Sequence, residues 1–135
     1  RLASLNARSV ISKKTDNEGL FYDLDPHVML LTETWLHNDV PDSDVVPPSY
    51  KIVRRDRPCG GGGVAIIVKT SINLTPLDGI PGHESLFSKV EVIGNTVVYR
   101  PPNADILFLE QFCHYAQRFR GVHTKLIIGN LTKLL

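Results

Sequence analysis

The sequence predicts an α/β or α+β sandwich with mixed, mostly antiparallel sheets, cut short at its carboxyl end. Three patterns lead to this prediction. A strand–helix–strand pattern opens the chain, several β-branched or alternating segments follow with turn signals between them, and one long helical pattern comes late, at residues 104–120. The composition agrees, because 135 residues with 42% hydrophobic and 21% charged side chains are typical of one globular domain.

The first three predicted elements form a βαβ unit. Residues 2–5 alternate between apolar and polar side chains and lead into Asn6, a helical segment follows, and residues 28–31 form an apolar run directly before Thr32 and Glu33. Parallel strands joined by a helical crossover end at the same edge of a sheet. We therefore expect Asn6 and Glu33 to lie at the same ends of neighbouring strands.

The helix within this unit is predicted to run to about Leu24. Thr15 or Asp16 is the expected N-cap residue, since both side chains can accept a hydrogen bond from the first backbone N–H groups. Leu20, Phe21 and Leu24 are spaced to form its buried apolar stripe.

Glu33 is the residue on which the functional prediction depends. Open α/β sheets bind ligands in the crevice beyond the carboxyl ends of their strands. A carboxylate held there on a rigid strand suits a hard divalent cation such as Mg²⁺. A solvated carboxylate in a strand-to-loop turn is the more common case, so Glu33 alone does not decide between the two.

The rest of the chain is predicted to be mainly strands. Residues 37–49 have the proline and aspartate content of a loop, and Gly94-Asn95, with a shift of one residue allowed, signals a hairpin turn. The predicted strands are residues 50–54, 64–68, 72–77, 86–93, 96–99 and 126–129. The late helix would turn one apolar face inward, formed by Ile106, Phe108, Leu109, Phe112 and Ala116.

Four consecutive glycines, residues 60–63, resemble a phosphate-binding loop only superficially. Such a loop needs a lysine directly after the last glycine and a helix behind it, whereas a strand follows here. We interpret the run as a hairpin turn with close backbone packing. The net charge is only +1, so any basic surface is local, and Arg54, Arg55 and Arg57 form the clearest candidate.

Five features, in this order and at this spacing, resemble the endonuclease domain of non-LTR (LINE-like) retrotransposons, and the resemblance runs from residue 2 to residue 129. That domain belongs to the apurinic/apyrimidinic-endonuclease and DNase-I-like superfamily, which also includes exonucleases and phosphatases. The features are Asn6, Leu31-Thr32-Glu33-Thr34-Trp35-Leu36, Arg54-Arg55-Asp56-Arg57, Gly63-Val64-Ala65-Ile66 and Tyr99-Arg100-Pro101-Pro102-Asn103.

The resemblance implies a four-layer α/β/β/α sandwich with an active site across the sheet ends. It makes Glu33 the ligand of Mg²⁺, with Mn²⁺ as an alternative, and Asn6 the neighbour that orients the metal site and the scissile phosphate. Tyr99 would hydrogen-bond the phosphate, and Arg100 and Asn103 would line the same cleft. Such a site neutralises charge on the phosphoryl group while fixed donors hold it in line for an activated water.

The chain departs from the family pattern after the last predicted strand. The family has Gly-Asp-Phe-Asn there, and its Asp activates the water; this chain has Gly129-Asn130-Leu131-Thr132. Either Asn130 replaces the Asp, or a two-residue deletion removed it, and an amide cannot accept the proton. The family's terminal Asp-His pair would fall beyond Leu135. We therefore expect residues 1–135 to be an incomplete domain, lacking its C-terminal part, that does not cut DNA by itself.

The predicted function is thus a fragment of a Mg²⁺-dependent DNA endonuclease that nicks target sites for retrotransposition. Its expected partners are DNA and a reverse transcriptase domain in the parent polyprotein, inside the cell in the nucleus or cytoplasm, with no membrane and no obligate oligomer. The alternative is a degenerate, non-catalytic remnant that binds nucleic acid weakly. Its contacts would be Lys51, Arg54, Arg55 and Arg57.

Overall fold

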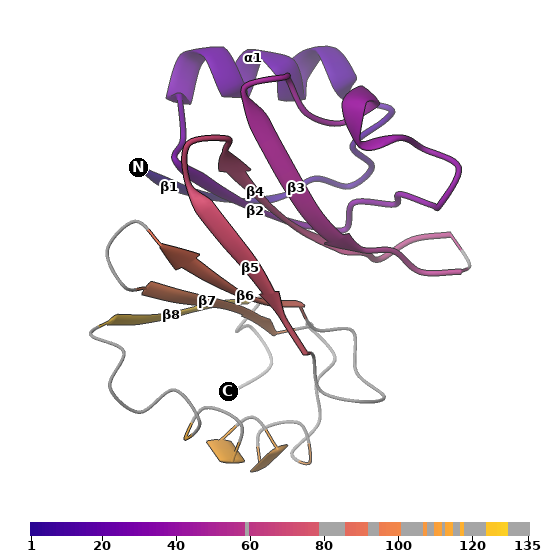
Figure 1. Cartoon of the computed structure of the whole chain (residues 1–135). Coiled ribbons are helices and arrows are strands. Elements are labelled where there is room, and N and C mark those ends of the chain that lie inside the picture. Colours follow the sequence, from indigo (N-terminus) through magenta and orange to yellow (C-terminus); the bar gives the residue numbers. More distant parts are fainter. Residues whose placement is uncertain are drawn as a thin grey trace. The chain divides into compact units, whose positions relative to one another are not determined.

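The structure of the chain is a computed structural model. It describes residues 1–58, 60–78, 86–91, 95–100, 107, 110–111, 113–114, 117 and 124–129. The chain divides into two compact units, Arg1–Ile72 and Asn73–Leu135, and Figure 1 shows the elements of each. In the part of the chain that the structure describes, no helix has the length and apolar character needed to cross a membrane.

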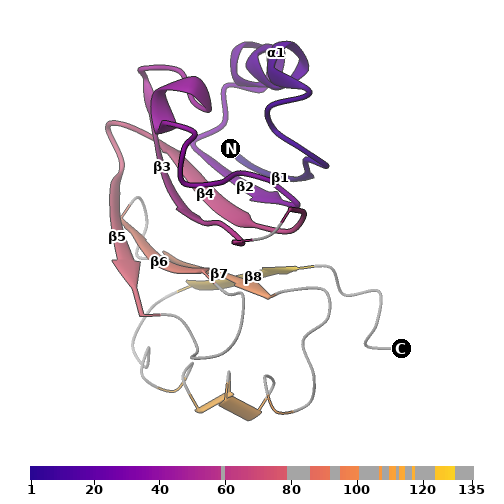
Figure 2. The same cartoon turned by 90° about the vertical axis from the view of Figure 1, so that its right-hand side faces the viewer.

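The first unit has a four-stranded mixed sheet, one α-helix and one short 3-10 helix. The strands follow the order β1-β2-β4-β3; β1 and β2 are parallel, and the other neighbours are antiparallel. The helix α1 and the short 3-10 helix η1 lie on the same face of the sheet (Figures 1 and 2). The predicted parallel βαβ unit is thereby confirmed. The bounds are β1 Leu2–Asn6, α1 Lys14–Leu24, β2 Val28–Thr32, η1 Asp42–Asp44, β3 Tyr50–Arg55 and β4 Val64–Lys69.

The central strands β2 and β4 are buried on both faces, which explains their continuous apolar sequence. Met29 and Ile67 belong to the core cluster that includes Phe21 of α1. Leu30 and Ile66, whose side chains alternate to the opposite face, are only 1% exposed. This rigid centre carries the residues that follow β2.

The helix α1 begins earlier than predicted. Its N-cap residue is Lys13, which makes no side-chain capping bond, so the predicted caps at Thr15 and Asp16 are wrong. The reason is that the preceding turn runs directly into the helix: the Lys14 N–H donates to the carbonyl of Ile11 at 3.3 Å. The apolar stripe is also narrower, because Phe21 is buried and Leu20 packs on the core, whereas Leu24 is 45% exposed.

The second unit contains a mixed sheet in the order β5-β6-β7-β8, with β7 and β8 parallel. Asn95, half of the predicted Gly94-Asn95 turn, belongs to β7 and pairs with Val90. Gly94 lies outside the described residues. Pro76 is tolerated because β5 is an edge strand. The bounds are β5 Asn73–Leu77, β6 Leu86–Glu91, β7 Asn95–Arg100 and β8 Thr124–Gly129.

The predicted late helix falls mostly on residues that the structure does not describe. Within it, residues 107, 110, 111, 113 and 114 are helical and exposed. The five residues of its predicted inner face, Ile106, Phe108, Leu109, Phe112 and Ala116, lie outside the described residues.

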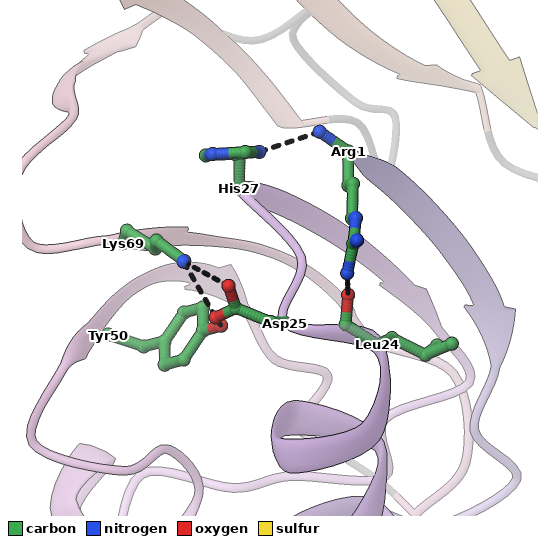
Figure 3. A network of polar contacts seen from close by, with 6 residues as sticks. All are labelled: Arg1, Leu24, Asp25, His27, Tyr50 and Lys69. Carbon is green, nitrogen blue, oxygen red and sulfur yellow. Dashed lines mark hydrogen bonds and ion pairs between the residues drawn. The ribbon is translucent and has the colours of Figure 1, made fainter.

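Charged and aromatic side chains tie the end of α1 to β3 and β4 (Figure 3). Lys69 Nζ lies 2.6 Å and 2.7 Å from the two carboxylate oxygens of Asp25, and the Tyr50 hydroxyl donates to Asp25 Oδ1 at 3.4 Å. The hydrogen bond from Lys69 lowers the pKa of Asp25 below its ordinary value, and burial raises the pKa of Tyr50. At the same end of α1, the Arg1 guanidinium donates a hydrogen bond to the carbonyl of Leu24 at 3.1 Å.

The lowered pKa of Asp25 predicts a loss of stability in acid. Its contribution is fully present above the ordinary pKa of 3.8 and disappears as the pH falls through the lower pKa of the folded protein. We expect Asp25→Asn to show a smaller fall in the free energy of unfolding than the wild type between about pH 5 and pH 2. Urea denaturation followed by circular dichroism measures this fall. Asp23→Asn, an exposed change on α1, serves as the control, and equal falls in the wild type and Asp25→Asn would contradict the prediction.

Candidate functional site

The structure brings the two predicted site residues of the first unit to one edge of the sheet. Asn6, the last residue of β1, pairs with Thr32, the last residue of β2, and Glu33 follows directly. Asn6 is exposed and Glu33 is half-buried. The predicted placement of Asn6 and Glu33 at the same ends of neighbouring strands is therefore confirmed, while their chemical roles stay predictions.

The loop after β1 fixes the backbone around Glu33. The Ser9 N–H donates to the carbonyl of Glu33 at 3.0 Å, and the Val10 N–H donates to the carbonyl of Thr34 at 3.0 Å. Val10 and Thr34 are buried, so the second of these bonds is shielded from water. The carboxyl ends of β1 and β2 thus continue as two loops that hold each other.

The glycine run holds Glu33 from the other side. Because β4 is antiparallel to β2, Thr32 pairs with Val64, and the glycines before Val64 lie beside the residues after Thr32. The Trp35 N–H donates to the carbonyl of Gly62 at 2.9 Å, and the Thr34 N–H donates to the carbonyl of Gly63 at 3.3 Å. From the sequence this run is only a turn, whereas in the structure it also forms one wall of the candidate site.

The Glu33 carboxylate is held by two donors. Its Oε2 accepts a hydrogen bond from Trp35 Nε1 at 2.9 Å and another from the Gly62 N–H at 3.1 Å. Both bonds go to the same oxygen, so neither uses Oε1. The carboxylate therefore has a fixed orientation with one oxygen directed away from these donors. The sequence did not indicate that Trp35 and Gly62 hold this carboxylate, although Trp35 stands only two residues after Glu33.

The turn that carries Glu33 has an unfavourable backbone. Glu33 and Trp35 both have φ of +54°, in the left-handed region that L residues seldom adopt. Such residues persist where the surrounding structure determines them, and they are enriched at functional sites. The bonds from the two neighbouring loops supply that constraint here.

Close packing explains why glycines are needed in the neighbouring loop. Gly61, Gly62 and Gly63 have φ of +87°, +70° and +85°. A Cβ on Gly62 would overlap the side chain of Arg57, and a Cβ on Gly63 would overlap Thr34 Oγ1. The predicted hairpin turn with close backbone packing is confirmed, since β3 and β4 pair on either side of it.

Arg54 does not belong to the basic patch that the sequence suggested. Its side chain is only 15% exposed; Nε lies 3.2 Å from Asp42 Oδ1 and 3.5 Å from Asp56 Oδ2, and Nη2 donates to the carbonyl of Val40 at 2.6 Å. Asp42 lies in η1, so Arg54 ties β3 to that segment. Arg55 is exposed and keeps its place as a candidate contact for nucleic acid.

Arg57 is exposed too, and it lies closer to Glu33 than the sequence indicated. Its side chain packs against Gly62, the residue whose N–H binds the Glu33 carboxylate. A positive charge is therefore present beside the site. Lys51, the other predicted basic contact, is half-buried on β3.

The remaining predicted site residues belong to the second unit. Tyr99 and Arg100 are the last two residues of β7, where they pair with Ile128 and Gly129 of β8. Their side chains lie outside the described part of the structure, as do Asn103 and Asn130. The position of these residues relative to Glu33 stays a prediction.

The side-chain oxygens of Glu33 and Asn6 are suitable ligands for a hard cation that is otherwise bound by water and phosphate. Among the described residues, no three His, Cys, Asp or Glu side chains come together to form a metal cage. Mg²⁺ does not need one, since it is commonly bound by one or two carboxylates and completes its shell with waters and substrate phosphates. The oriented Glu33 carboxylate and the amide oxygen of Asn6 are suitable oxygen donors for such a site.

No protein-family model and no curated protein matches the chain. Solved structures do match, and the following three each cover 95% of this chain. An AP endonuclease from Archaeoglobus fulgidus gives a TM-score of 0.70 at 22% identity over 55% of its own chain. The 3'-5' exonuclease NExo from Neisseria meningitidis gives 0.67 at 16% over 56%. The endonuclease domain of TRAS1, a telomere-specific non-LTR retrotransposon, gives 0.60 at 13% over 56%.

At these identities the likeness establishes the fold. The chain has the DNase-I-like α/β sandwich fold, as predicted, with two mixed sheets. It spans a little over half the length of these three structures, each of which is matched over 55% or 56%.

Proposed function

We propose that this chain is the amino-terminal part of a divalent-metal-dependent DNA endonuclease domain of the non-LTR retrotransposon type. One observation carries the proposal: the Glu33 carboxylate is held by Gly62 and Trp35 on a strained turn, beside Asn6, at one edge of the sheet. The shared fold with the TRAS1 endonuclease domain supports it. In this proposal the parent polyprotein also carries a reverse transcriptase and works in the nucleus or cytoplasm.

Each proposed residue has a defined task. Glu33, assisted by Asn6, would hold Mg²⁺ or Mn²⁺, and a bound cation would offset the negative charge of the scissile phosphate. The Tyr99 hydroxyl would donate to a phosphate oxygen, and Arg100 and Asn103 would bind the neighbouring backbone of DNA. Fixed donors of this kind stabilise charge that develops on the phosphoryl oxygens.

The chain by itself binds but does not cut in this proposal. Hydrolysis needs a base that takes a proton from the attacking water, and the residue after Gly129 is Asn130, whose amide cannot do so. The proposal therefore separates two properties, cation binding at Glu33 and strand cleavage, and an experiment can measure each one.

The first test uses Trp35, which is the only tryptophan of the chain and donates to the Glu33 carboxylate. We expect Mg²⁺ or Mn²⁺ to change its fluorescence in a saturable way. Glu33→Gln should weaken the apparent cation affinity at least about tenfold, because the charged ligand is lost while the shape is kept. Glu18→Gln, an exposed change on α1, is the matched control and should respond like the wild type. A wild-type chain without any saturable response would contradict the proposal.

The second test is magnesium-dependent nicking of supercoiled plasmid by the purified chain. We expect no nicking by the wild type or by Glu33→Gln. Nicking by the wild type alone would keep the endonuclease assignment but overturn the proposed inactivity, because another group would then activate the water. A chain without cation response and without nicking would instead support the alternative of a non-catalytic remnant.

A further inference from the structure

Trp35 has a second feature that cation binding does not use. Trp35 is 47% exposed. The polar atom of its side chain, Nε1, already donates a hydrogen bond to Glu33. The exposed part is therefore the apolar ring, which has no need of water for hydrogen bonding. A tryptophan that served only to pack the core would bury this surface.

The ring is also held in place. Residues on both sides of Trp35 are buried, Thr34 at 0% and Leu36 at 2% exposure, and the Trp35 N–H donates to the carbonyl of Gly62 at 2.9 Å. With Nε1 bound to Glu33, the side chain has little freedom to turn. A large, flat, exposed and immobilised aromatic surface therefore stands next to the Glu33 carboxylate.

Positive charge flanks this surface. The side chain of Arg57 packs against Gly62, whose N–H and carbonyl bind Glu33 and Trp35. Arg8 is exposed in the loop after β1, between Ala7 and Ser9, whose N–H groups bind the carbonyls of Thr32 and Glu33. An aromatic face with guanidinium groups nearby is the combination that binds unpaired nucleotides, because bases stack on the ring and phosphates pair with the cations.

We infer that Trp35 is a stacking surface for an unpaired nucleobase adjacent to the phosphate at the Glu33 site, with Arg57 contacting the flanking backbone. This inference rests on the proposed function for the nature of the polymer. It adds that the preferred strand is single-stranded or locally unpaired at this position, since the faces of paired and stacked bases are not accessible. Stacking on a ring tolerates every base, so little sequence preference should come from this contact.

The test measures binding of a fluorescein-labelled eight-residue oligothymidylate by anisotropy, in chelator so that no cation takes part. Trp35→Ala should weaken binding at least about fivefold, and Trp35→Phe, which keeps a ring, should lose much less. Tyr22→Ala is the control, because Tyr22 is 79% exposed on α1, away from Glu33 in the sequence, and should leave binding unchanged. Arg57→Gln should reduce the salt dependence of binding by about one counterion.

A second measurement needs no substitution. The unlabelled oligothymidylate should quench the fluorescence of Trp35 in the wild type, and a DNA hairpin duplex of equal length should quench it much less. Equal affinities of Trp35→Ala and the wild type, or absence of quenching, would overturn the inference. The binding test is made in chelator, so a failure of the stacking inference is distinct from a failure of the proposed function. The latter would appear as a missing cation response of Trp35 fluorescence.

Discussion

Gly63→Ala should lower the free energy of unfolding by about 2–4 kcal/mol, although it adds a single methyl group. The backbone at Gly63 has φ of +85°, in the positive range that residues other than glycine seldom adopt. A Cβ there would also overlap Thr34 Oγ1, and Thr34 is fully buried, so it has no room to move. Strain and steric overlap therefore add at the same position.

Gly60→Ala is the matched control in the same loop. Gly60 is exposed, its backbone is not left-handed, and a Cβ would have nothing within 4 Å. We expect its free energy of unfolding to stay within about 0.5 kcal/mol of the wild type, or to rise slightly because the unfolded chain loses entropy. Urea denaturation followed by circular dichroism compares the two variants, and similar losses would contradict the role assigned to Gly63.

The same substitution should disturb the candidate site. The carbonyl of Gly63 accepts the Thr34 N–H, and the next glycine, Gly62, donates to the Glu33 carboxylate. Moving this segment by a few tenths of an ångström changes the orientation of Glu33. In conditions where Gly63→Ala remains folded, we expect a weaker cation response of Trp35 fluorescence than in Gly60→Ala.

Short-range patterns in the sequence predicted the part of the fold that positions Glu33. The apolar run that forms β2 is buried because it lies at the centre of a sheet, and a helix between two strands favours a parallel pair. These two local facts were enough to place Asn6 and Glu33 together. The start of α1 was missed because a backbone bond from Lys14 to Ile11, and not a side chain, begins that helix.

The contacts that define the site could not be predicted, because they depend on pairing between distant segments. Gly62 is 29 residues from Glu33, and only the antiparallel register of β2 and β4 brings its N–H to the carboxylate. Arg54 appeared as one of three arginines within four residues, and nothing local showed that Asp42 and Val40 would bind it. Burial is decided by the fold, so a run of like charges in the sequence does not establish a charged surface.

Arg54→Ala should therefore destabilise the protein by about 3 kcal/mol, as expected when one partner of a buried ion pair is removed. Asp56 is only 8% exposed and would lose the guanidinium that lies 3.5 Å from its Oδ2. The carbonyl of Val40 would lose its donor as well. Within the described residues, Asp56 Oδ1 is already buried without a hydrogen-bond partner, so no other donor stands ready to replace Arg54 at this carboxylate.

Arg55→Ala is the control that separates a structural arginine from a surface one. Arg55 is exposed, so its loss should leave stability within about 0.5 kcal/mol of the wild type while weakening binding of DNA at low salt.

The double variant Arg54→Met/Asp56→Leu should be more stable than Arg54→Met alone, because it leaves no unpaired buried charge. If Arg54→Ala kept full stability and instead weakened DNA binding as much as Arg55→Ala, the three arginines would form one surface, as the sequence first suggested.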